Sequence, residues 1–375
     1  MSRLNKLIQQ YCPDGVEYKR LGDICKLARG TRVVKKDLSI NGAYPVYQNS
    51  LKPLGYYDQF NRAEETTFII CAGAAGDIGY SKVKFWSADD CFSVICPDTI
   101  SNRYVFYCLL SQQNRIYSQV RKASIPRLSH SAVEALYIPV PPLPVQEEIV
   151  RILDTFAELQ AELQAELQKR LQQYNYYRDK LLSFNELNRG GQNVSVEWKK
   201  LEDCCQILDN KRKPITKGAR VAGEYPYYGA NGVQDYVANY IFDGKYVLVG
   251  EDGSVITPSG TPVVNWAEGK IWVNNHAHII SEKKGVLLRY LFHYLQTINI
   301  TPLIHGNIPK LTGGDFRALT IPVPPLPVQE EIVRILDRFS TLTTDITAGL
   351  PAEIEARRKQ YEYYRDQLLT FKQKA

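Results

Sequence analysis

The chain has 375 residues, of which 44% are hydrophobic and 23% charged, an ordinary globular composition at a length that suits two or three domains. Lysine and arginine exceed aspartate and glutamate by 46 to 40, and the net charge of +6 permits an anionic partner without requiring one. The sequence has no run of eighteen apolar residues, no signal-peptide-like segment near its start and no CxxC pair among its eight cysteines, so we expect a cytoplasmic protein whose thiols bind no metal.

Short landmarks of the first half of the chain recur in the second half in the same order. The pairs, each marked by its first residue, are VEYKRLGDIC (Val16) and VEWKKLEDCC (Val196), GAYPVYQNS (Gly42) and GEYPYYGAN (Gly223), NRYVFYCLL (Asn102) and LRYLFHYLQ (Leu288), and SIPRLS (Ser124) and NIPKLT (Asn307). Between them lie strand-like runs, TTFIICAG and FSVIC in the first half and KYVLVG and KIWVNN in the second, bounded by Gly, Asp and Asn turns. Each half therefore predicts one mixed α/β domain.

The two halves become identical at one stretch, because residues 138–154 and 321–337 both read IPVPPLPVQEEIVRILD. Prolines hold φ near about −65° and remove backbone donors, whereas the QEEIVRILD part has a helix former at nearly every position. Each copy therefore predicts a proline hinge that leads into a helix.

Apolar residues continue from each hinge at spacings of three and four, which predicts two long helices with one apolar face each. The stripes are Ile149, Leu153, Phe156, Leu159, Leu163, Leu167, Leu171, Tyr174, Tyr177, Leu181 and Phe184, and Ile332, Leu336, Phe339, Leu342, Ile346, Leu350, Ile354, Tyr361, Tyr364, Leu368 and Phe371. AELQ is repeated from Ala157, Ala161 and Ala165 in the first helix, whereas Gly349-Leu350-Pro351 interrupts the second. We expect the helices to pack antiparallel and bury both stripes.

The degree of agreement differs along the two copies. Hinges and helix ends (YNYYRDKLLSF and YEYYRDQLLTF) agree almost residue for residue, while the globular segments share only landmarks. This contrast predicts a scaffold with two-fold pseudo-symmetry that carries two different heads. Such a protein can contact two sites on duplex DNA and read a different sequence at each.

These features together resemble the specificity subunit of Type I restriction-modification systems, and PPLPVQEEIVRILD with the AELQ triplet carries the resemblance. The resemblance implies an α+β fold in which two mixed α/β target recognition domains, 1–144 and 186–327, alternate with helical regions, 145–185 and 328–375. It implies that each recognition domain reads one half of a bipartite site in double-stranded DNA. It also implies that the helices set the spacing and dock two methyltransferase subunits, with restriction subunits joining the larger complex, and that the chain itself is non-catalytic and binds no cofactor.

Polar and basic residues in loops beside the landmarks are the candidate DNA contacts. Lysine and arginine neutralise phosphates, arginine also binds guanine, and amide side chains pair with adenine edges. The candidates are Arg29, Arg32, Lys35, Lys36, Gln48, Asn49, Lys122 and Arg127 in the first half and Lys211, Arg212, Lys213, Asn231, His305, Asn307 and Lys310 in the second. Solvated surface charge explains any single one of them equally well.

The duplicated hinges supply the candidate partner contacts. Packing of the apolar stripe does not require polar residues to be duplicated, whereas two copies of one partner would explain it. The candidates are Pro142, Gln146, Glu147, Arg151, Pro325, Gln329, Glu330 and Arg334.

Catalytic alternatives find little support in the sequence. It has no GxxxxGK[ST] motif and no Asn-Pro-Pro-aromatic motif, and the glycine-rich run 73–79 lies between strand-like segments, as a turn does. Asp252, Glu268 and Lys270 form a loose nuclease-like pattern with no counterpart in the other half. A DNA-acting enzyme and a pure coiled-coil adaptor therefore remain as alternatives.

Two histidines form the only metal-like pair that the sequence suggests. His276 and His278 alternate on a predicted strand, so their side chains share one face. No third ligand follows at a metal-motif spacing, so we expect a structural or DNA-facing role and no metal.

Overall fold

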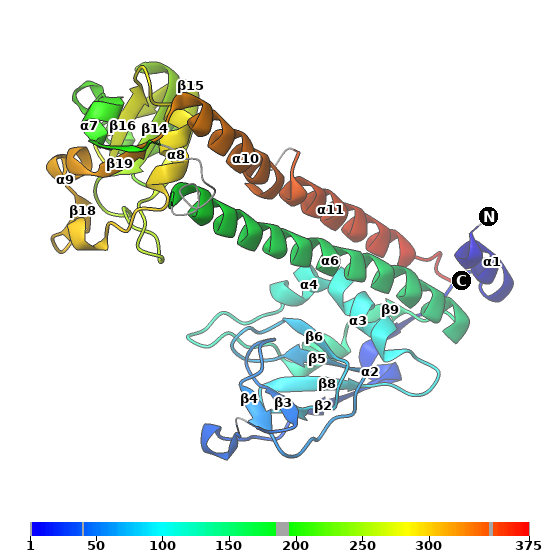
Figure 1. Ribbon diagram of the computed structural model, residues 1–375. Helices are drawn as coiled ribbons and strands as arrows, with labels where there is room; N and C mark the ends of the chain where they lie inside the picture. Colours follow the sequence, from blue (N-terminus) through cyan, green and yellow to red (C-terminus); the bar gives the residue numbers. More distant parts are fainter. Residues whose placement is uncertain (1, 40, 185–194, 345–347, 375) are drawn as a thin grey trace. The chain divides into compact units, whose positions relative to one another are not determined.

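The computed structural model describes residues 2–39, 41–184, 195–344 and 348–374 (Figure 1). The chain divides into two compact units, Met1–Gln164 with Glu353–Ala375, and Ala165–Ala352. Each unit combines helices with sheets, which confirms the predicted fold class. The predicted domain boundary at 185/186 and Ile346 of the second stripe lie outside the described residues.

The first unit contains most of the first half of the chain and the C-terminal helix. Its strands are β1 (Tyr18–Arg20), β2 (Lys26–Arg29), β3 (Tyr44–Tyr47), β4 (Gly55–Tyr57), β5 (Thr66–Ile70), β6 (Ile78–Ser81), β7 (Trp86–Ser87), β8 (Cys91–Ile95) and β9 (Tyr137–Pro139). Its helices are α1 (Arg3–Tyr11), α2 (Leu21–Ile24), the 3-10 helix η1 (Lys35–Asp37), α3 (Asn102–Ser111), α4 (Gln113–Ser118), α5 (His130–Glu134), the first part of α6 (Leu143–Leu182) and most of α11 (Leu350–Leu368).

The second unit repeats this order with longer strands. Its strands are β10 (Glu197–Lys200), β11 (Cys205–Ile207), β12 (Ala222–Gly229), β13 (Gly232–Val237), β14 (Phe242–Gly250), β15 (Val264–Val273), β16 (Ala277–Glu282), β17 (Ile304–His305), β18 (Lys310–Leu311) and β19 (Thr320–Val323). Its helices are the end of α6, α7 (Leu201–Cys204), η2 (Asp209–Lys211), η3 (Lys217–Ala219), α8 (Leu288–Leu295), η4 (Thr301–Leu303), α9 (Gly313–Ala318) and α10 (Leu326–Thr344).

The central sheets of the two units share one strand order. The first unit has β2-β8-β5-β6 and β4-β3-β7, and the second has a single sheet, β11-β16-β14-β15-β12-β13. A parallel pairing recurs, because Val46 faces Trp86 in the first unit as Tyr227 faces Trp272 in the second. The long strand β15 takes the places of both β6 and β7, which segment 82–85 separates. One topology is therefore built twice, with its sheet divided in the first unit.

A small sheet ties the start of each unit to its hinge. β1 pairs antiparallel with β9, and β10 pairs antiparallel with β19. Tyr104 of α3 and Tyr290 of α8 each donate a hydrogen bond to a proline carbonyl of these strands, Pro139 at 3.1 Å and Pro322 at 2.6 Å. Each proline hinge therefore starts from a fixed position on its own domain.

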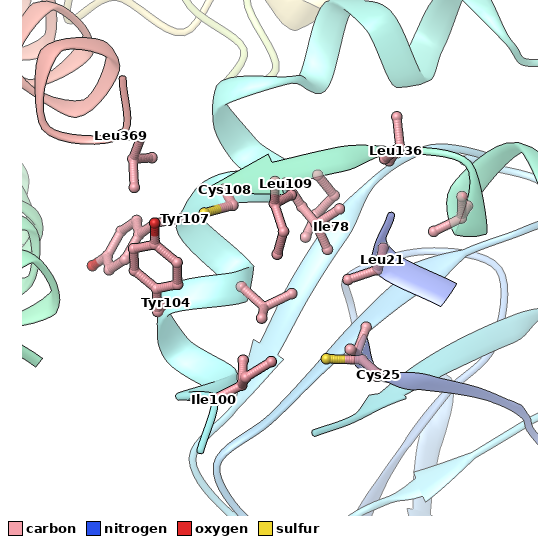
Figure 2. Packing of buried hydrophobic residues seen from close by; sticks show 14 of the residues in the cluster. Leu21, Cys25, Ile78, Ile100, Tyr104, Tyr107, Cys108, Leu109, Leu136 and Leu369 are labelled. Carbon is pink, nitrogen blue, oxygen red and sulfur yellow. The ribbon is translucent and has the colours of Figure 1, made fainter. Parts of the chain in front are cut away.

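The C-terminal segment completes the core of the first unit. Figure 2 shows Tyr104 and Leu109 of α3 packed near Ile78 of β6, with Leu369, just beyond α11, on the other side. The backbone N–H of Val16 also donates to the carbonyl of Lys372 at 2.8 Å. Removing this apolar surface from water at both ends of the chain stabilises the unit.

In each unit the helix leaving the hinge packs antiparallel against the far end of the other copy's helix. Phe156 of α6 stacks on Tyr364 of α11, and Phe339 of α10 stacks on Tyr177 of α6, with ring centroids 5.5 Å apart in both pairs. The phenylalanines follow the hinges and the tyrosines belong to the YYRD segments, so one contact occurs twice with the copies exchanged. The predicted antiparallel pairing is confirmed within each unit.

The second predicted helix consists of two segments. α10 ends at Thr344 and α11 begins at Leu350, so the predicted interruption at Gly349-Leu350-Pro351 is confirmed. Pro351 lies in the first turn of α11, where a missing N–H costs no helical hydrogen bond. The AELQ triplet lies inside the continuous 40-residue α6. None of the described helices is both long and apolar enough to cross a membrane.

Candidate nucleic-acid interface and docking hinges

Four predicted DNA contacts of the first unit surround one hollow of about 360 Å³. These are Arg32 and Lys35, which follow β2, and Gln48 and Asn49, which follow β3. Two loops that are distant in the sequence thus place two cations and two amides together. This combination can neutralise phosphates and pair with base edges.

A second hollow of about 400 Å³ contains two more predicted cations, Arg29 and Arg127, beside Phe92. Arg29 ends β2, and Arg127 lies on a hairpin whose strands meet at Arg121 and Arg127. Lys36 and Lys122 are exposed on the segments that carry Lys35 and Arg127.

The loop after β5 joins the residues of these two hollows. The N–H of Ala74 donates to the carbonyl of Asn49 at 2.9 Å, and the N–H of Gly73 donates to the carbonyl of Pro126 at 3.2 Å. Gly73 has a φ of +86°, and a Cβ there would lie 2.8 Å from the carbonyl oxygen of Asn49, so glycine permits the close approach. The interpretation of run 73–79 as a turn between strands is confirmed.

The basic run of the second unit, residues 211–213, occupies the same place in the fold as the basic loop of the first unit, residues 29–36. The N–H of Thr31 donates to the carbonyl of Ser87, and the N–H of Lys213 donates to that of Val273. In both units a tryptophan indole caps the loop, from Trp86 to the carbonyl of Thr31 at 2.8 Å and from Trp272 to that of Lys213 at 2.6 Å. Lys211 and Lys213 are exposed there.

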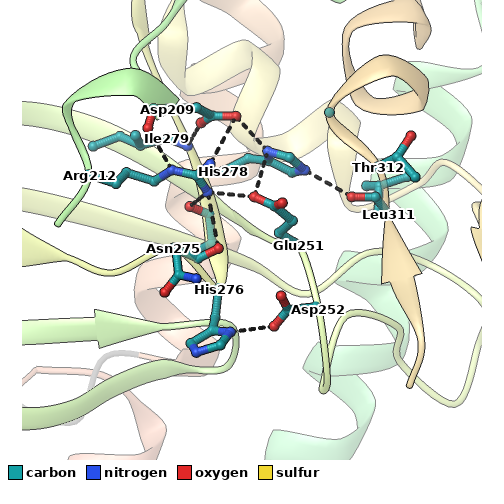
Figure 3. Close-up of polar contacts among 12 residues, drawn as sticks. Asp209, Arg212, Glu251, Asp252, Asn275, His276, His278, Ile279, Leu311 and Thr312 are labelled. Carbon is teal, nitrogen blue, oxygen red and sulfur yellow. Dashed lines mark hydrogen bonds and ion pairs between the residues drawn. The ribbon is translucent and has the colours of Figure 1, made fainter. Parts of the chain in front are cut away.

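Arg212 corrects the sequence-based list of DNA contacts, because its guanidinium points inward (Figure 3). Its side chain is 12% exposed and lies 2.6 Å from Glu251 and 3.6 Å from Asp209. It also donates to the carbonyl of Ala277 at 2.7 Å. With its donors used on two half-buried carboxylates and a carbonyl, Arg212 holds the domain together and does not face a ligand.

His278 belongs to the same network. Its Nδ1 lies 2.7 Å from Asp209, its Nε2 lies 3.0 Å from the carbonyl of Leu311, and its ring stacks on Phe316 at 4.3 Å. Burial alone would raise the pKa of Asp209, but the hydrogen bond from His278 holds it below its usual value. Ligand atoms of Asp209, Glu251 and His278 lie within 4.8 Å of one another, and the two carboxylates already pair with Arg212 and, at Glu251, with Lys310. His276 lies just before β16 and pairs with Asp252.

The hairpin of β17 and β18 carries three more predicted contacts of the second unit. His305 and Lys310 pair across β17 and β18, with exposed Asn307 in the loop between them. His305 lies 3.2 Å from Asp315, and Lys310 lies 3.5 Å from Glu251. Both side chains are at least 47% exposed and so remain accessible to a ligand.

The base-reading candidates differ between the units. Ala88 donates to the carbonyl of Tyr47 and Asn274 to that of Tyr228, which makes these tyrosines equivalent. Gln48 and Asn49 therefore correspond to Gly229 and Ala230. Asn231 is exposed in the turn between β12 and β13.

Gln146 and Gln329 were expected to be exposed docking residues, and that expectation is wrong because both side chains are fully buried. Gln146 accepts from the N–H of Ser101 at 2.9 Å and donates to the carbonyl of Pro141 at 2.7 Å. Gln329 makes the same two bonds to Leu287 and Pro324. Their duplication follows from a shared internal role, since each amide satisfies buried backbone groups at the hinge.

The other hinge residues are exposed in both copies. They are Pro142, Glu147 and Arg151, and Pro325, Glu330 and Arg334. Arg151 also bonds Glu148 at 2.8 Å, which lowers the pKa of that buried carboxyl, and Arg3 of α1 lies 3.4 Å from the same group. Arg334 pairs with Glu331, which is 54% exposed.

Sequence reasoning missed an ionic contact that fixes each hinge helix on its domain. Arg103 of α3 lies 2.7 Å from Asp154 of α6, and Arg289 of α8 lies 2.7 Å from Asp337 of α10. The available signal was the arginine at the same place in both short-helix landmarks and the aspartate that ends both 17-residue repeats.

The third member of this contact differs between the units. Tyr107 bonds Asp154, whereas His293 lies 2.7 Å from Asp337. Burial holds the pKa of His293 below its usual value despite the neighbouring carboxylate. Burial alone would raise the pKa of Asp337, but hydrogen bonds from His293 and Arg289 keep it lowered.

Two exposed tyrosines were also missed. Tyr176 and Tyr363, the first tyrosines of the two YYRD segments, are 60% and 62% exposed. Tyr363 belongs to the unit with the first hinge and Tyr176 to the unit with the second. Each unit thus carries one exposed hinge together with a largely exposed tyrosine from the other copy.

The nuclease-like residues do not meet. Glu268 pairs with Lys245 across β14 and β15, whereas Asp252 lies beyond the end of β14 and pairs with His276. At about 3.3 Å per residue, these carboxylates lie roughly 20 Å apart along the strand. Lys270 lies over Tyr240 at 4.9 Å from the ring centroid. This arrangement does not form a two-acid metal site.

The model of the family described as Type I restriction modification DNA specificity domain matches the chain twice, at residues 13–173 and 193–356. The chain therefore belongs to the family of Type I restriction-modification DNA specificity subunits.

Individual relatives agree with this assignment. The Type I restriction enzyme EcoR124I/EcoR124II specificity subunit of Escherichia coli is 29% identical over 430 residues, which cover 99% of this chain and 97% of that one. A putative type I restriction enzyme specificity subunit of Haemophilus influenzae is 44% identical over 179 residues, and this match spans 46% of each chain. The crystal structure of a Type I restriction-modification system S subunit from M. genitalium has the same fold, with a TM-score of 0.68 at 17% identity over 95% of this chain and 96% of that one.

Proposed function

We propose that each unit reads one half of a bipartite site in double-stranded DNA and that the chain performs no chemistry itself. The observation that carries this proposal is the pair of equivalent loop sites on one shared backbone framework. The backbone N–H groups of Thr31 and Lys213 make equivalent hydrogen bonds in the two units. At the neighbouring loop, the amide pair Gln48 and Asn49 of the first unit is replaced by Gly229 and Ala230 in the second. Loops at equivalent positions that carry different side chains suit two domains that each recognise a different DNA sequence.

The proposed partners are two methyltransferase subunits, with restriction subunits in the larger complex. Duplicated exposed hinges, each accompanied in its unit by an exposed tyrosine, support two equivalent docking sites. Exposed aromatic and arginine side chains are typical anchors of protein interfaces. A structural neighbour with a TM-score of 0.55, solved in a study of the complex assembly and conformational transition of the type I R-M system, supports a place in such an assembly. Adenine methylation and DNA cleavage would belong to these partners, in the cytoplasm.

Purified protein separates this proposal from its alternatives. The chain alone should bind duplex DNA with an affinity that falls with salt, and it should neither methylate nor cleave DNA given a methyl donor and magnesium. Adding methyltransferase subunits should produce methylation at a two-part motif. Activity of the chain alone would establish an enzyme, and a complex that methylates its motif equally well without this chain would establish an adaptor.

A further inference from the structure

Each unit exposes one isoleucine at the tip of a matched hairpin, and we refer to segments 121–128 and 304–311 as the IP hairpins. Ile125 is 53% exposed and Ile308 is 69% exposed. Within the same tetrapeptide, Leu128 and Leu311 are buried at 4% and 0% exposure. In both units, therefore, the leucine of the hairpin is buried in the core while the isoleucine is exposed to solvent.

Backbone hydrogen bonds fix each tip against the equivalent loop of its own unit. Gly73 donates to the carbonyl of Pro126 and Gly253 donates to that of Pro309, at 3.2 and 2.9 Å. Leu128 and Leu311 donate to the carbonyls of Cys71 and Glu251, both at 2.9 Å.

The end of each hairpin is fixed as well. Ser129 and Thr312 follow the hairpins and cap α5 and α9 with their hydroxyls. The tip proline adds its own restriction of φ. Each isoleucine is thus held on a rigid support, which lowers the entropy cost of inserting it into a partner.

The surroundings of the tips indicate the partner. Arg121, Lys122 and Arg127 are exposed on the first hairpin, and Lys310 is exposed on the second. The first hairpin also adjoins the loop that contacts Asn49, in the proposed reading site. A cation-flanked aliphatic tip matches the way in which apolar wedges enter a base step while nearby cations hold the phosphates.

Comparison of the units separates this role from sequence reading. Residues that read bases should differ between units that read different sequences, as Gln48 and Gly229 do. A residue that is the same in both units, at the same place and more than half exposed in each, should do what both half-sites require.

We propose that Ile125 and Ile308 are wedges that unstack a base step at each half-site whatever its sequence. This inference rests on the proposed function. Methyl transfer to a base requires that base to leave the stack, and a wedge lowers the cost of extruding it.

The test uses the complete complex of this chain with its methyltransferase subunits. Ile125→Ala should slow methylation of the half-site read by the first unit by roughly tenfold, Ile308→Ala should do the same for the second, and the motif should not change. A 2-aminopurine placed beside the target adenine should brighten on binding of the wild-type complex and less with the variant. Val83→Ala and Val221→Ala, which truncate aliphatic residues that are 54% and 69% exposed, are the matched controls and should leave both rates unchanged.

Several outcomes would overturn the wedge. Unchanged rates and fluorescence would do so, as would relaxation of the motif at one base, which would make the isoleucine a reader of that base. Loss of methyltransferase binding without DNA, by native mass spectrometry, would make the tip a protein contact. These results leave the proposed function intact, whereas a wild-type complex that methylates without a two-part motif would refute the proposed function itself.

Discussion

The space beneath the IP hairpin is filled differently in the two units. Register places Phe92 of β8 and His278 of β16 at equivalent positions, opposite Ile69 and Val249. In the first unit Phe92 packs edge-on against His130, and in the second His278 stacks on Phe316. Because Ser129 and Thr312 are equivalent caps, His130 corresponds to Gly313 and Phe316 to Val133. An imidazole thus replaces a phenyl ring on the strand, and the ring that it contacts comes from a different position of the following helix.

His278 at this strand position belongs to an ionic network in the second unit. Cys71 and Glu251 occupy equivalent places, since each accepts from the leucine of its hairpin. Glu251 pairs with Arg212, so one cation of the second unit's basic run lies in the interior of that unit. Backbone hydrogen bonds preserve the fold while the side chains above them change, so basic residues of the first unit stay exposed whereas Arg212 supports the domain in the second.

The largest expected effect tests this difference directly. Arg212→Ala leaves two carboxylates without their partner and should lower the free energy of unfolding of the second unit by about 3–5 kcal/mol. Arg29→Ala, in the basic segment of the first unit, removes an exposed side chain and should change the free energy of unfolding of that unit by less than about 0.5 kcal/mol. Urea unfolding of both variants measures this, and equal losses would show that the network is unimportant.

The basic loops should contribute to DNA affinity in both units. Lys211→Ala with Lys213→Ala, and separately Arg32→Ala with Lys35→Ala, should weaken binding and reduce the slope of log affinity against log salt by up to about 0.9 per lost phosphate contact. Lys199→Ala, which removes an exposed lysine paired with Glu197, is the control and should leave the slope unchanged. If neither pair alters the slope, the loops do not contact phosphates.

Charge reversal at the hinges should test the two docking sites. Arg151 is unsuitable because it balances the buried Glu148, so the exposed Glu147 and Glu330 are the better positions. Glu147→Lys and Glu330→Lys should each remove one methyltransferase subunit, raising its dissociation constant by about tenfold. Glu162→Lys, on the exposed side of α6, is the control. Native mass spectrometry showing two bound subunits in the double variant would exclude these residues from the interface.

The smallest expected effect is a pH dependence confined to the second unit. Burial lowers the pKa of His293, so the unfolded chain binds a proton at a higher pH than the folded one. Stability is then fully present above about pH 6.5 and falls as the pH drops toward the lowered pKa. His293→Tyr introduces the residue that the first unit has at Tyr107 and should remove this loss. Urea unfolding at pH 7.5 and 5.5 compares the two proteins, and an unchanged loss would place its origin elsewhere.

Periodicity and repetition were sufficient to predict the elements of the fold. Prolines, helix formers and matched landmarks indicated the hinges, α3, α8 and the main strands because each depends on local geometry. The break before Leu350 was also signalled by Gly349 and Pro351.

Burial of polar groups was not predictable in the same way. Gln146 resembles a surface residue until the N–H of Ser101, 45 positions earlier, is known to need an acceptor. Arg212 lies between two lysines that remain exposed, and only the distant Glu251 and Ala277 show that it turns inward. Clusters of basic residues therefore indicated loops that the fold brings together, while the orientation of each side chain depended on tertiary contacts.

Exchange of one head tests the central claim, that two units on one framework each read one half-site. Residues 196–320 would be replaced by the matching segment of another member of the family, with both hinges retained. Methylome sequencing of a strain that carries this hybrid should show one half of the methylated motif changed, with the other half and the gap between them unchanged. A hybrid that changes both halves, or an active one that changes neither, would contradict independent reading by the two units.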